Sequence, residues 1–318
     1  MKLRSVAAAS VLTLGGAVFL AAPAHAGLVT YCDGEGGEVT VPGDLVVDEG
    51  KSCTLTGTTV QGDVEVRDSA NLIVTDGTVN GELSVHDDGL LDAEDTEIAG
   101  NVITHSAYGA YLEGSDIGAS VESAALPDGY EDGYLYAISS TVGASLNATT
   151  GSVYVESSRL GGDLVGDGAE YTDVYDSTVQ GQLRVEDTAE GGVFCGGEVY
   201  GSATYQDNAG VVQIGASGPV ATCTAVSYWD EDVRAQGNTA DIYIDNNIIA
   251  GDLVAQDNDP VALAGTNNRV RGAMIGDFED MPTVQTFSIE DRTADIEQQH
   301  EQRTTEAESA AEEAGPAF

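Results

Sequence analysis

The sequence predicts an all-β fold, a single-stranded parallel β-helix in which about 12 short coils stack along one axis. The first observation is a 19-residue period, because a glycine preceded two positions earlier by a β-branched residue recurs at Gly43, Gly62, Gly81 and Gly100. Ala119 takes the fifth place. The second observation is that aliphatic residues stand two positions before and two after each of these anchors. Like residues in register at a fixed short period are typical of repeats that bury their apolar faces by stacking. For stacked parallel strands, a right-handed coil is the usual expectation.

The first 26 residues have the features of a secretory signal peptide. Lys2 and Arg4 precede an apolar run, and Ala24-His25-Ala26 forms the small-residue cleavage pattern just before Gly27. No later run has the length and apolarity of a membrane span. The sequence therefore predicts a secreted protein that is extracellular or associated with the cell surface.

The composition is strongly acidic, with 54 acidic and 11 basic residues and a formal net charge of −43 at pH 7. Such a chain repels nucleic acid and anionic lipid, so neither is expected as a partner. Two interpretations of the charge stay open, a surface kept hydrated at high salt and an ordinary acidic secreted protein. The charge bears on solubility and partners, and not on the fold.

Four cysteines follow the leader, and in a secreted chain they are expected to pair. Pairing of Cys32 with Cys53 and of Cys195 with Cys223 suits a stacked fold, because each partner lies about one coil away. The first bond would clamp the N-terminal end of the stack. A metal site is not favoured, because the chain has no Cys-x-x-Cys pattern.

Within each coil, alternating apolar and polar residues predict strands with one face inside, as in residues 60–66 and again in residues 72–74. The anchor glycine is expected to point inward where a narrow coil bends. After Ala119 the period stretches through a loop around residues 126–134. Between Gly201 and Gly251 it blurs enough to hold one or two unmatched coils. Residues 27–276 are assigned to the β-helix.

Residues 277–318 are predicted to form a C-terminal cap and an acidic tail. Exposed strand edges at both ends of a stack invite polymerisation unless they are covered. The segment at residues 32–41 is expected to cap the first coil. At the other end, five apolar residues are expected to lie over the last coil: Phe278, Met281, Val284, Phe287 and Ile289. The tail at residues 290–314, rich in Glu, Gln and Ala, predicts a solvated helix or a disordered segment.

The Val-x-Gly-x-Val-x-Val units between residues 41 and 274 resemble those of secreted parallel β-helix repeat proteins of the pectate-lyase-like kind. The short coil is similar to that of bactofilins, which polymerise through exposed coil ends. The resemblance implies the fold far more than an activity. The leader and the expected disulfides depart from the bactofilin pattern and argue against a cytoskeletal role.

An outward column of tyrosines is the best candidate binding site. Tyr111, Tyr136 and Tyr154 stand eight residues before the anchors of consecutive coils, each between two inward positions. In register, they would form an exposed aromatic stripe on which sugar rings can stack, with Tyr130 and Tyr134 brought beside it by the neighbouring loop. The same residues also suit strand positions where they stack for stability. Glycan binding and structural stacking both stay open.

Two columns of acidic residues are candidates for calcium, the one cofactor that the sequence suggests. Asp44, Asp63 and Glu82 follow the anchors by one position, and another three residues follow them by six: Glu49, Asp68 and Asp87. Carboxylates one strand spacing apart can share a calcium ion. Turn residues that hydrogen-bond the nearby backbone explain the same pattern. His86 and His105, 19 residues apart, are expected to be neighbours.

The regular repeat favours a non-enzymatic scaffold with a surface or matrix role. Its expected partner is an extracellular polysaccharide or a cell-surface component, bound through the tyrosine column. The alternative is a polysaccharide lyase or a glycoside hydrolase of the β-helix type. A hydrolase needs two carboxylates roughly 5 to 9.5 Å apart, and a lyase needs a base, for which the chain offers four arginines near strands: Arg159, Arg184, Arg269 and Arg271. None stands in a recognisable motif, and no catalytic residue is predicted.

Overall fold

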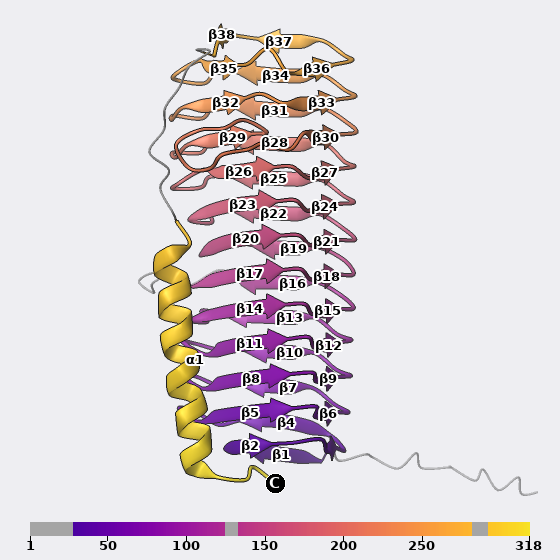
Figure 1. The fold of residues 1–318 in the computed structure, drawn as a ribbon, viewed down its shortest axis with the longest axis vertical. Helices are drawn as coiled ribbons and strands as arrows, with labels where there is room; N and C mark the ends of the chain where they lie inside the picture. The colour runs from indigo at the N-terminus through magenta and orange to yellow at the C-terminus, as the bar shows by residue number, and fades with distance from the viewer. Residues whose placement is uncertain (1–27, 125–132, 282–291) are drawn as a thin grey trace, which may run out of the picture.

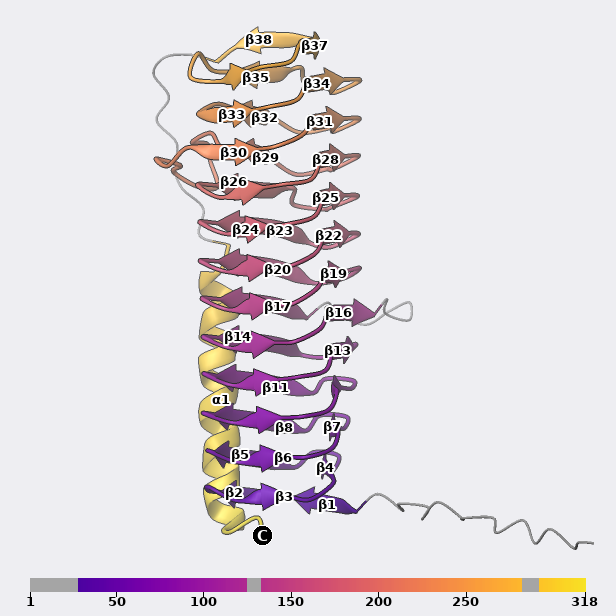
Figure 2. The same cartoon turned by 90° about the vertical axis from the view of Figure 1, so that its right-hand side faces the viewer.

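A computed structural model describes residues 28–124, 133–281 and 292–318. The signal peptide prediction, Tyr130, Val284, Phe287 and Ile289 lie outside the described residues. The described strands stack into a rod of about 13 coils, and a single helix runs along one side of it (Figures 1 and 2). The predicted parallel β-helix with a repeat of about 19 residues is confirmed, with one coil more than expected.

Each coil contributes one strand to each of three parallel sheets, which we name A, B and C, with 13, 13 and 12 described strands. Sheet A contains β1 (Val29–Cys32), β4 (Asp44–Val47), β7 (Val64–Val66), β10 (Leu83–Val85), β13 (Val102–His105), β16 (Val121–Ala124), β19 (Leu146–Ala148), β22 (Leu164–Asp167), β25 (Leu183–Glu186), β28 (Ala203–Gln206), β31 (Val233–Gln236), β34 (Leu253–Gln256) and β37 (Met274–Gly276).

Sheet B contains β2 (Gly34–Gly36), β5 (Ser52–Thr56), β8 (Asn71–Thr75), β11 (Leu90–Glu94), β14 (Gly109–Glu113), β17 (Tyr134–Ile138), β20 (Ser152–Glu156), β23 (Tyr171–Tyr175), β26 (Gly192–Cys195), β29 (Val212–Ile214), β32 (Ile242–Ile244), β35 (Ala262–Ala264) and β38 (Phe278–Asp280). Sheet C contains β3 (Thr40–Val41), β6 (Thr59–Val60), β9 (Thr78–Val79), β12 (Glu97–Ile98), β15 (Asp116–Ile117), β18 (Thr141–Val142), β21 (Arg159–Leu160), β24 (Thr178–Val179), β27 (Glu198–Val199), β30 (Ser227–Trp229), β33 (Asn247–Ile249) and β36 (Arg269–Val270).

The inward columns form one continuous core. Val64, Leu83 and Val102 pair with one another in register on sheet A, and each is 0–1% exposed. Burial of like aliphatic side chains from one coil to the next removes apolar surface along the whole rod. The column predicted to follow the anchors by two positions is therefore confirmed as core.

The corner between sheets B and C is lined by buried hydroxyls that satisfy the backbone. The amide of Ser115 donates to Ser140 Oγ at 3.0 Å, that of Ser140 to Ser158 Oγ at 2.9 Å, and that of Ser158 to Ser177 Oγ at 3.0 Å. These four serines are 1–4% exposed. Backbone groups that cannot join a sheet ladder at the bend thus keep their hydrogen bonds inside the rod.

The anchor glycines lie at partly exposed corners between sheets C and A, so the expectation that they point inward is wrong. A Cβ on Gly62 would lie 2.1 Å from Asp44 Oδ1 and 2.7 Å from the carbonyl carbon of Gly43. On Gly81 it would lie 2.2 Å from Asp63 Oδ1. The glycine is favoured because the corner of one coil packs directly on the corner of the coil before it.

Two coils, the first of them extended by an insertion, fill the stretch between Gly201 and Gly251. Strands β28 to β30 belong to consecutive sheets, and residues 215–226 form the insertion between β29 and β30. Glu231 stands at the anchor position, because the carbonyl carbon of Glu231 lies beneath Gly251 in the stack. Glutamate in place of glycine hides the repeat from the sequence pattern.

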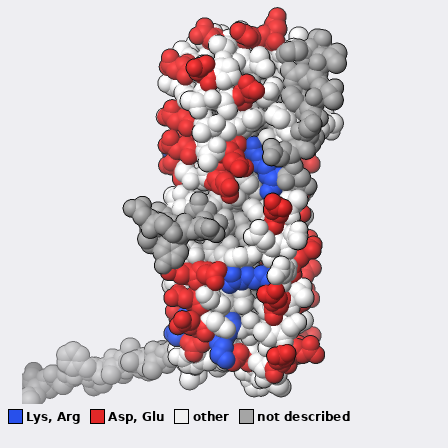
Figure 3. Space-filling model, turned by 90° about the vertical axis from the view of Figure 1, so that its left-hand side faces the viewer, with Lys and Arg blue, Asp and Glu red and all other residues white. Residues whose placement is uncertain are grey.

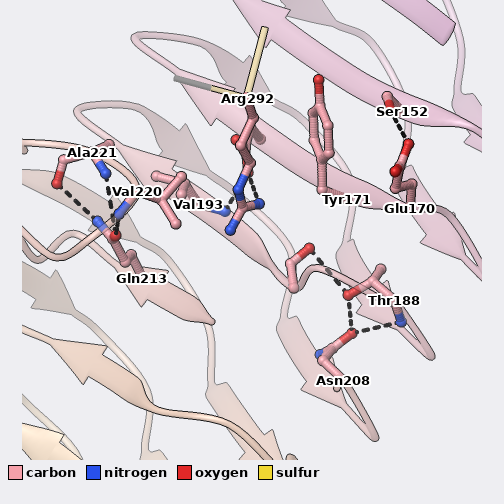
Figure 4. Close-up of polar contacts among 12 residues, drawn as sticks. Ser152, Glu170, Tyr171, Thr188, Val193, Asn208, Gln213, Val220, Ala221 and Arg292 are labelled. Atoms are coloured by element: carbon pink, nitrogen blue, oxygen red, sulfur yellow. Dashed lines mark hydrogen bonds and ion pairs between the residues drawn. The ribbon is translucent and has the colours of Figure 1, made fainter. Parts of the chain in front are cut away.

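Both expected disulfides are present. Cys32–Cys53 joins the first coil to the second. Cys195–Cys223 ties the insertion to β26, where Val193 and Ala221 pack with the two sulfurs in a small apolar cluster. Gln213 supports the same insertion, since its side chain bonds the backbone of Ala216, Val220 and Ala221 (Figure 4).

The C-terminal segment returns along the rod and does not stay in solvent. Phe278 lies in β38, which pairs with β35 and extends sheet B, so the expectation that it lies over the last coil is wrong. Helix α1 (Ala294–Ala314) then runs beside sheet B back to the first coil (Figure 1). Within the described residues, no helix is both long and apolar enough to cross a membrane.

Residues after α1 cover the edge of the first coil. The Glu35 amide donates to Gly315 O at 2.9 Å, and the Ala317 amide donates to Glu35 O at 2.8 Å, so Pro316 pairs with β2 as a short parallel bridge. Phe318 lies against Gly36, and Ala317 packs on the core. Residues 32–41, expected to form the cap, build the first coil itself and are capped by the C-terminus.

Candidate functional site

The predicted tyrosines form a continuous column on the outer face of sheet B. Strand pairing places Tyr111, Tyr136 and Tyr154 side by side, with ring centroids 6.1 and 5.3 Å apart. The same register places Asp92 before Tyr111 and Asp173 after Tyr154. We call these five residues the aromatic-acidic column. Three neighbouring rings, each tilted by 42° against the next, lie between two carboxylates.

Helix α1 covers this column, so the prediction of an exposed stripe is wrong. Tyr136 is 0% exposed and Tyr134 is 7% exposed, while Tyr111 and Tyr154 are partly buried. With Leu90 and Tyr108, these tyrosines form a second apolar cluster outside the main core, against which Ile296 of the helix packs. The sequence did not show that the acidic tail returns to this face.

The helix contacts the column through His300 and through Thr304, whose hydroxyl donates to Asp92 Oδ2 at 3.2 Å. His300 stacks on Tyr111 with centroids 4.2 Å apart, its Nδ1 lies 2.8 Å from the Tyr134 hydroxyl, and its Nε2 lies 3.3 Å from Asp92 Oδ2. Planar nitrogen-bearing groups on tyrosine faces are favourable through the ring quadrupole. Imidazole, phenol and carboxylate thus meet at one end of the column.

Arg303 makes a second set of contacts beside the column. Its guanidinium lies 4.1 Å from the centroid of Tyr108, donates from Nε to Asn71 Oδ1 at 2.9 Å and from Nη1 to Asp88 Oδ1 at 2.8 Å. Nη2 also donates to the carbonyl oxygen of Asp88. A guanidinium that combines ring stacking with a charge-assisted hydrogen bond fixes both the position and the rotation of the helix.

Arg292, just before the helix, closes the far end of the column. It lies beside the Tyr171 ring, 5.5 Å from its centroid (Figure 4). It also forms an ion pair of 3.4 Å with Asp173. The side chains of Arg292 and Asp173 are 9% and 2% exposed. Burial raises the pKa of Asp173 to about 6, against the opposing effect of Arg292.

Burial is also the largest cause of the raised pKa values of the tyrosines. It raises the pKa of Tyr111 to about 12, with Glu113 as the next cause, and it raises the pKa values of Tyr136 and Tyr154 further. The Tyr136 and Tyr171 hydroxyls lie 2.6 Å apart. These phenols therefore stay neutral at physiological pH and act as hydrogen-bonding and stacking groups.

The helix leaves a groove of about 540 Å³ where it crosses the first coils. Its lining includes six polar or aromatic residues: Ser52, Asn71, Tyr108, Gln299, Gln302 and Arg303. Arg303 occupies one face of Tyr108 there. The face that carries α1 is studded with acidic side chains, with a few basic ones among them (Figure 3).

The acidic residues proposed for calcium are held in backbone contacts. Asp44 Oδ1 accepts the Asp63 amide at 3.0 Å, and Asp63 Oδ1 accepts the Glu82 amide at 2.9 Å. Glu82 accepts a hydrogen bond from Asn101 at 3.2 Å. This ladder uses the carboxylates to join one corner to the next. Among the described residues, no group of three or more His, Cys, Asp or Glu side chains is placed to hold a metal ion.

The second acidic set occupies the turns between sheets A and B. Glu49 and Asp68 are exposed, and Asp87 is half-buried. The Asp68 and Asp87 carbonyl oxygens accept the amides of Gly50 and Ser69 from the coil before. These three residues serve as turn positions in the described geometry.

The expected histidine pair is confirmed. The rings of His86 and His105 stack with centroids 5.3 Å apart and an interplanar angle of 19°. His86 Nε2 lies 4.0 Å from Glu65 Oε1, and Glu65 also contacts Arg67.

The four arginines considered as catalytic bases lie apart. Arg159 is on sheet C and Arg184 on sheet A, where Arg184 pairs with Glu186. Arg269 is on the last strand of sheet C, and Arg271 follows it. Different sheets and distant coils do not bring these arginines together over one pair of carboxylates.

Five residues that define the column and its cover were missed at the sequence level: Asp92, Asp173, Arg292, His300 and Arg303. Asp92 and Asp173 lie one 19-residue step before Tyr111 and after Tyr154, so extension of the register would have found both. No periodic signal links the three basic residues to sheet B, since they follow the last coil.

Comparisons with known proteins identify no relative. No family model matches the chain, and neither does any curated protein or solved structure. The parallel β-solenoid is therefore established by the architecture alone, and function must be argued from the geometry.

Proposed function

We propose that this protein is a secreted, non-enzymatic rod with a structural role at a cell surface or in an extracellular matrix. The observation that carries the proposal is the continuous stack of three sheets, stapled by two disulfides and strapped by its own C-terminal helix. A stack of this kind holds its surface columns at fixed spacing along its length. The leader-like residues 1–26 and the disulfides support an oxidising, extracytoplasmic setting.

Location can be tested in cells that produce the chain naturally or from a plasmid. The culture is separated into cytoplasmic, cell-surface and medium fractions, and the protein is followed with an antibody against the folded rod. We expect a surface or medium location, an N-terminus at Gly27 by sequencing, and both disulfides intact by non-reducing mass spectrometry. A full-length, reduced protein in the cytoplasm would overturn the proposal.

A second experiment tests the glycan and enzyme hypotheses. The purified protein is applied to a polysaccharide array with and without calcium, and the products are searched for new reducing or unsaturated ends. Because α1 covers the aromatic-acidic column, we expect no cleavage and no binding that depends on Tyr111 or Tyr154. Binding that disappears in Tyr111→Ala while α1 stays docked would restore the glycan site, and cleavage would replace the scaffold with an enzyme.

A further inference from the structure

The interface between α1 and sheet B has the composition of a recognition site. Of the 21 residues in the helix, the three buried ones are His300, Ala307 and Ala311. Ile296 packs on the tyrosine cluster, and His300 and Arg303 make specific polar and ring contacts. Charge and planar stacking give this interface its specificity.

The charges of the two surfaces are complementary at the basic residues of the C-terminal segment. The helix carries seven acidic residues: Asp295, Glu297, Glu301, Glu306, Glu308, Glu312 and Glu313. Its basic groups face acidic residues of the rod: His300 lies at Asp92 of the column and Arg303 at Asp88 beside it, while Arg292, just before the helix, lies at Asp173. A helix so acidic, on a chain of net charge −43, is repelled by the rod elsewhere. The basic residues therefore determine where it docks.

The contacts between α1 and sheet B can break without disruption of the strands beneath. The Arg303–Asp88 pair is open to solvent on its carboxylate side, with side chains 18% and 59% exposed, so solvent screens and weakens it. The His300–Asp92 and Arg292–Asp173 pairs are largely buried, and the cost of desolvating their charges offsets part of their attraction. The strands beneath have their full ladders and a continuous core. Elements with few buried apolar contacts are the ones that detach first in local opening. Because only three of its residues are buried, α1 can open locally while the strands beneath stay paired.

We propose that the aromatic-acidic column, together with Tyr108 and Asp88, is a docking site for helix α1 of a second copy of this chain, and that the molecule's own α1 is its displaceable occupant. The segment Arg292 to Phe318 is the one ligand whose fit to this surface the structure displays. Exchange of an identical element between copies requires no new kind of interaction, because the same residues meet again across two molecules. The inference rests on the proposed scaffold for its biological role, as a means of joining rods.

The test uses the full chain and a fluorescent peptide of residues 292–318, followed by fluorescence anisotropy. The variant Arg303→Gln loosens the molecule's own helix while it leaves the column intact. We expect the peptide to bind this variant about tenfold more tightly than the wild-type chain, since the competing occupant is weakened. Arg234→Gln is the matched control, because Arg234 pairs with Asp232 on sheet A. It should bind the peptide as the wild type does.

The site itself is checked by adding Tyr111→Ala to Arg303→Gln, which should reduce peptide binding at least tenfold. Circular dichroism and the melting midpoint of the double variant report whether the rod still folds. If it does not fold, Asp88→Asn in the Arg303→Gln background replaces it, with the same expectation of weaker binding. Binding at full strength to either folded variant would overturn the proposed site.

Exchange between copies is read by sedimentation velocity on concentrated wild-type protein. We expect a dimer or longer assembly that an excess of the unlabelled peptide dissolves. A scrambled peptide of the same composition that binds equally well would show general attraction of basic groups and would overturn the second copy as the occupant. Equal peptide binding to Arg303→Gln and to the wild type would overturn the displaceable helix. All these measurements test only the binding of the C-terminal segment to sheet B. They can therefore contradict the docking site while the scaffold proposal stands, and the scaffold proposal can fail while the docking site stands.

Discussion

The two ends of the rod are finished in different ways. At the first coil, β2 pairs with Pro316, Cys32 is bonded to the second coil, and the core beneath is closed by Ala317. At the last coil, all three residues of β37 are exposed, with Met274 at 49% and Ile275 at 40%. One end is fastened by residues from the far end of the sequence, whereas the described residues of the other end present open strand edges and apolar side chains.

The difference shows that a repeat does not determine its own ends. Leu45 and Met274 occupy the same register on sheet A, linked through a series of strand pairs, yet Leu45 is 0% exposed. An inward position becomes core only when a neighbouring coil or a cap covers it. The position of a residue in the stack, and not its place in the repeat, therefore determines its contribution to stability.

The largest expected effect comes from a carboxylate introduced into the inward column of sheet A, either at the first coil or, in a separate variant, at the last. Leu45→Asp buries an unpaired carboxylate and should lower the free energy of unfolding by roughly 4 kcal/mol or more, or prevent folding. Met274→Asp places the same group in solvent and should change it by less than about 0.5 kcal/mol. Guanidinium denaturation followed by fluorescence measures both. Similar losses in the two variants would remove the distinction between the ends.

Removal of the Cys32–Cys53 bond tests how much the stability of the first coil depends on this disulfide. The two cysteines are 21 residues apart, and a loop of this size gives about 3 kcal/mol of stabilisation in the chain-entropy account. Cys32→Ala with Cys53→Ala should cost about that much. Cys195→Ala with Cys223→Ala, with a separation of 28, should cost a similar amount globally but loosen the insertion instead of the end. A loss below about 1 kcal/mol in the first variant would indicate that the helix alone fastens this end.

Asp173 makes the stability of the fold depend on pH. It lies beside Arg292, at the end of the C-terminal segment that is farthest from the first coil. Its pKa is raised from 3.8 to about 6 by burial, so the folded state binds the proton more tightly than the unfolded state. Its contribution to stability is therefore present at acid pH and is lost as the pH rises through about 6.

Denaturation at pH 4.5 and pH 7 should show this contribution as a relative gain at pH 4.5 on the order of 1–3 kcal/mol in the wild type over Asp173→Asn. The comparison of the two proteins cancels the titration of the other groups that they share. The same pH dependence in both proteins would show that Asp173 titrates as an ordinary carboxyl group.

The sequence predicted the repeated part of the molecule well and its unique parts poorly. The core columns, the disulfides and the neighbouring tyrosines all follow from register, because each coil repeats the environment of the one before it. The cover over Tyr136 does not follow from register, since α1 belongs to no repeat and contacts sheet B through His300 and Arg303. The inward glycine was predicted wrongly because alternation alone cannot distinguish a strand position from a corner.

The smallest expected effect concerns the half of the rod beyond the helix. The Tyr205 side chain is 0% exposed, and its hydroxyl has no hydrogen-bond partner in the part of the chain that the structure describes. Tyr205→Phe should leave the free energy of unfolding unchanged or raise it by up to about 1 kcal/mol. Tyr171→Phe, which removes the hydrogen bond to Tyr136, should lower it by about 1 kcal/mol. Denaturation midpoints that moved in the opposite order would contradict these assignments.

We infer that helix α1 and the residues after it hold the first coil in place. Hydrogen exchange measured by mass spectrometry on Arg303→Gln, with Arg234→Gln as control, tests this most directly. We predict faster exchange in residues 34–36 and 52–56, where the strap ends and the first strands pair, and unchanged exchange in residues 262–280 at the open end. Equal exchange in variant and wild type at residues 34–36, or an equal increase at both ends, would contradict it.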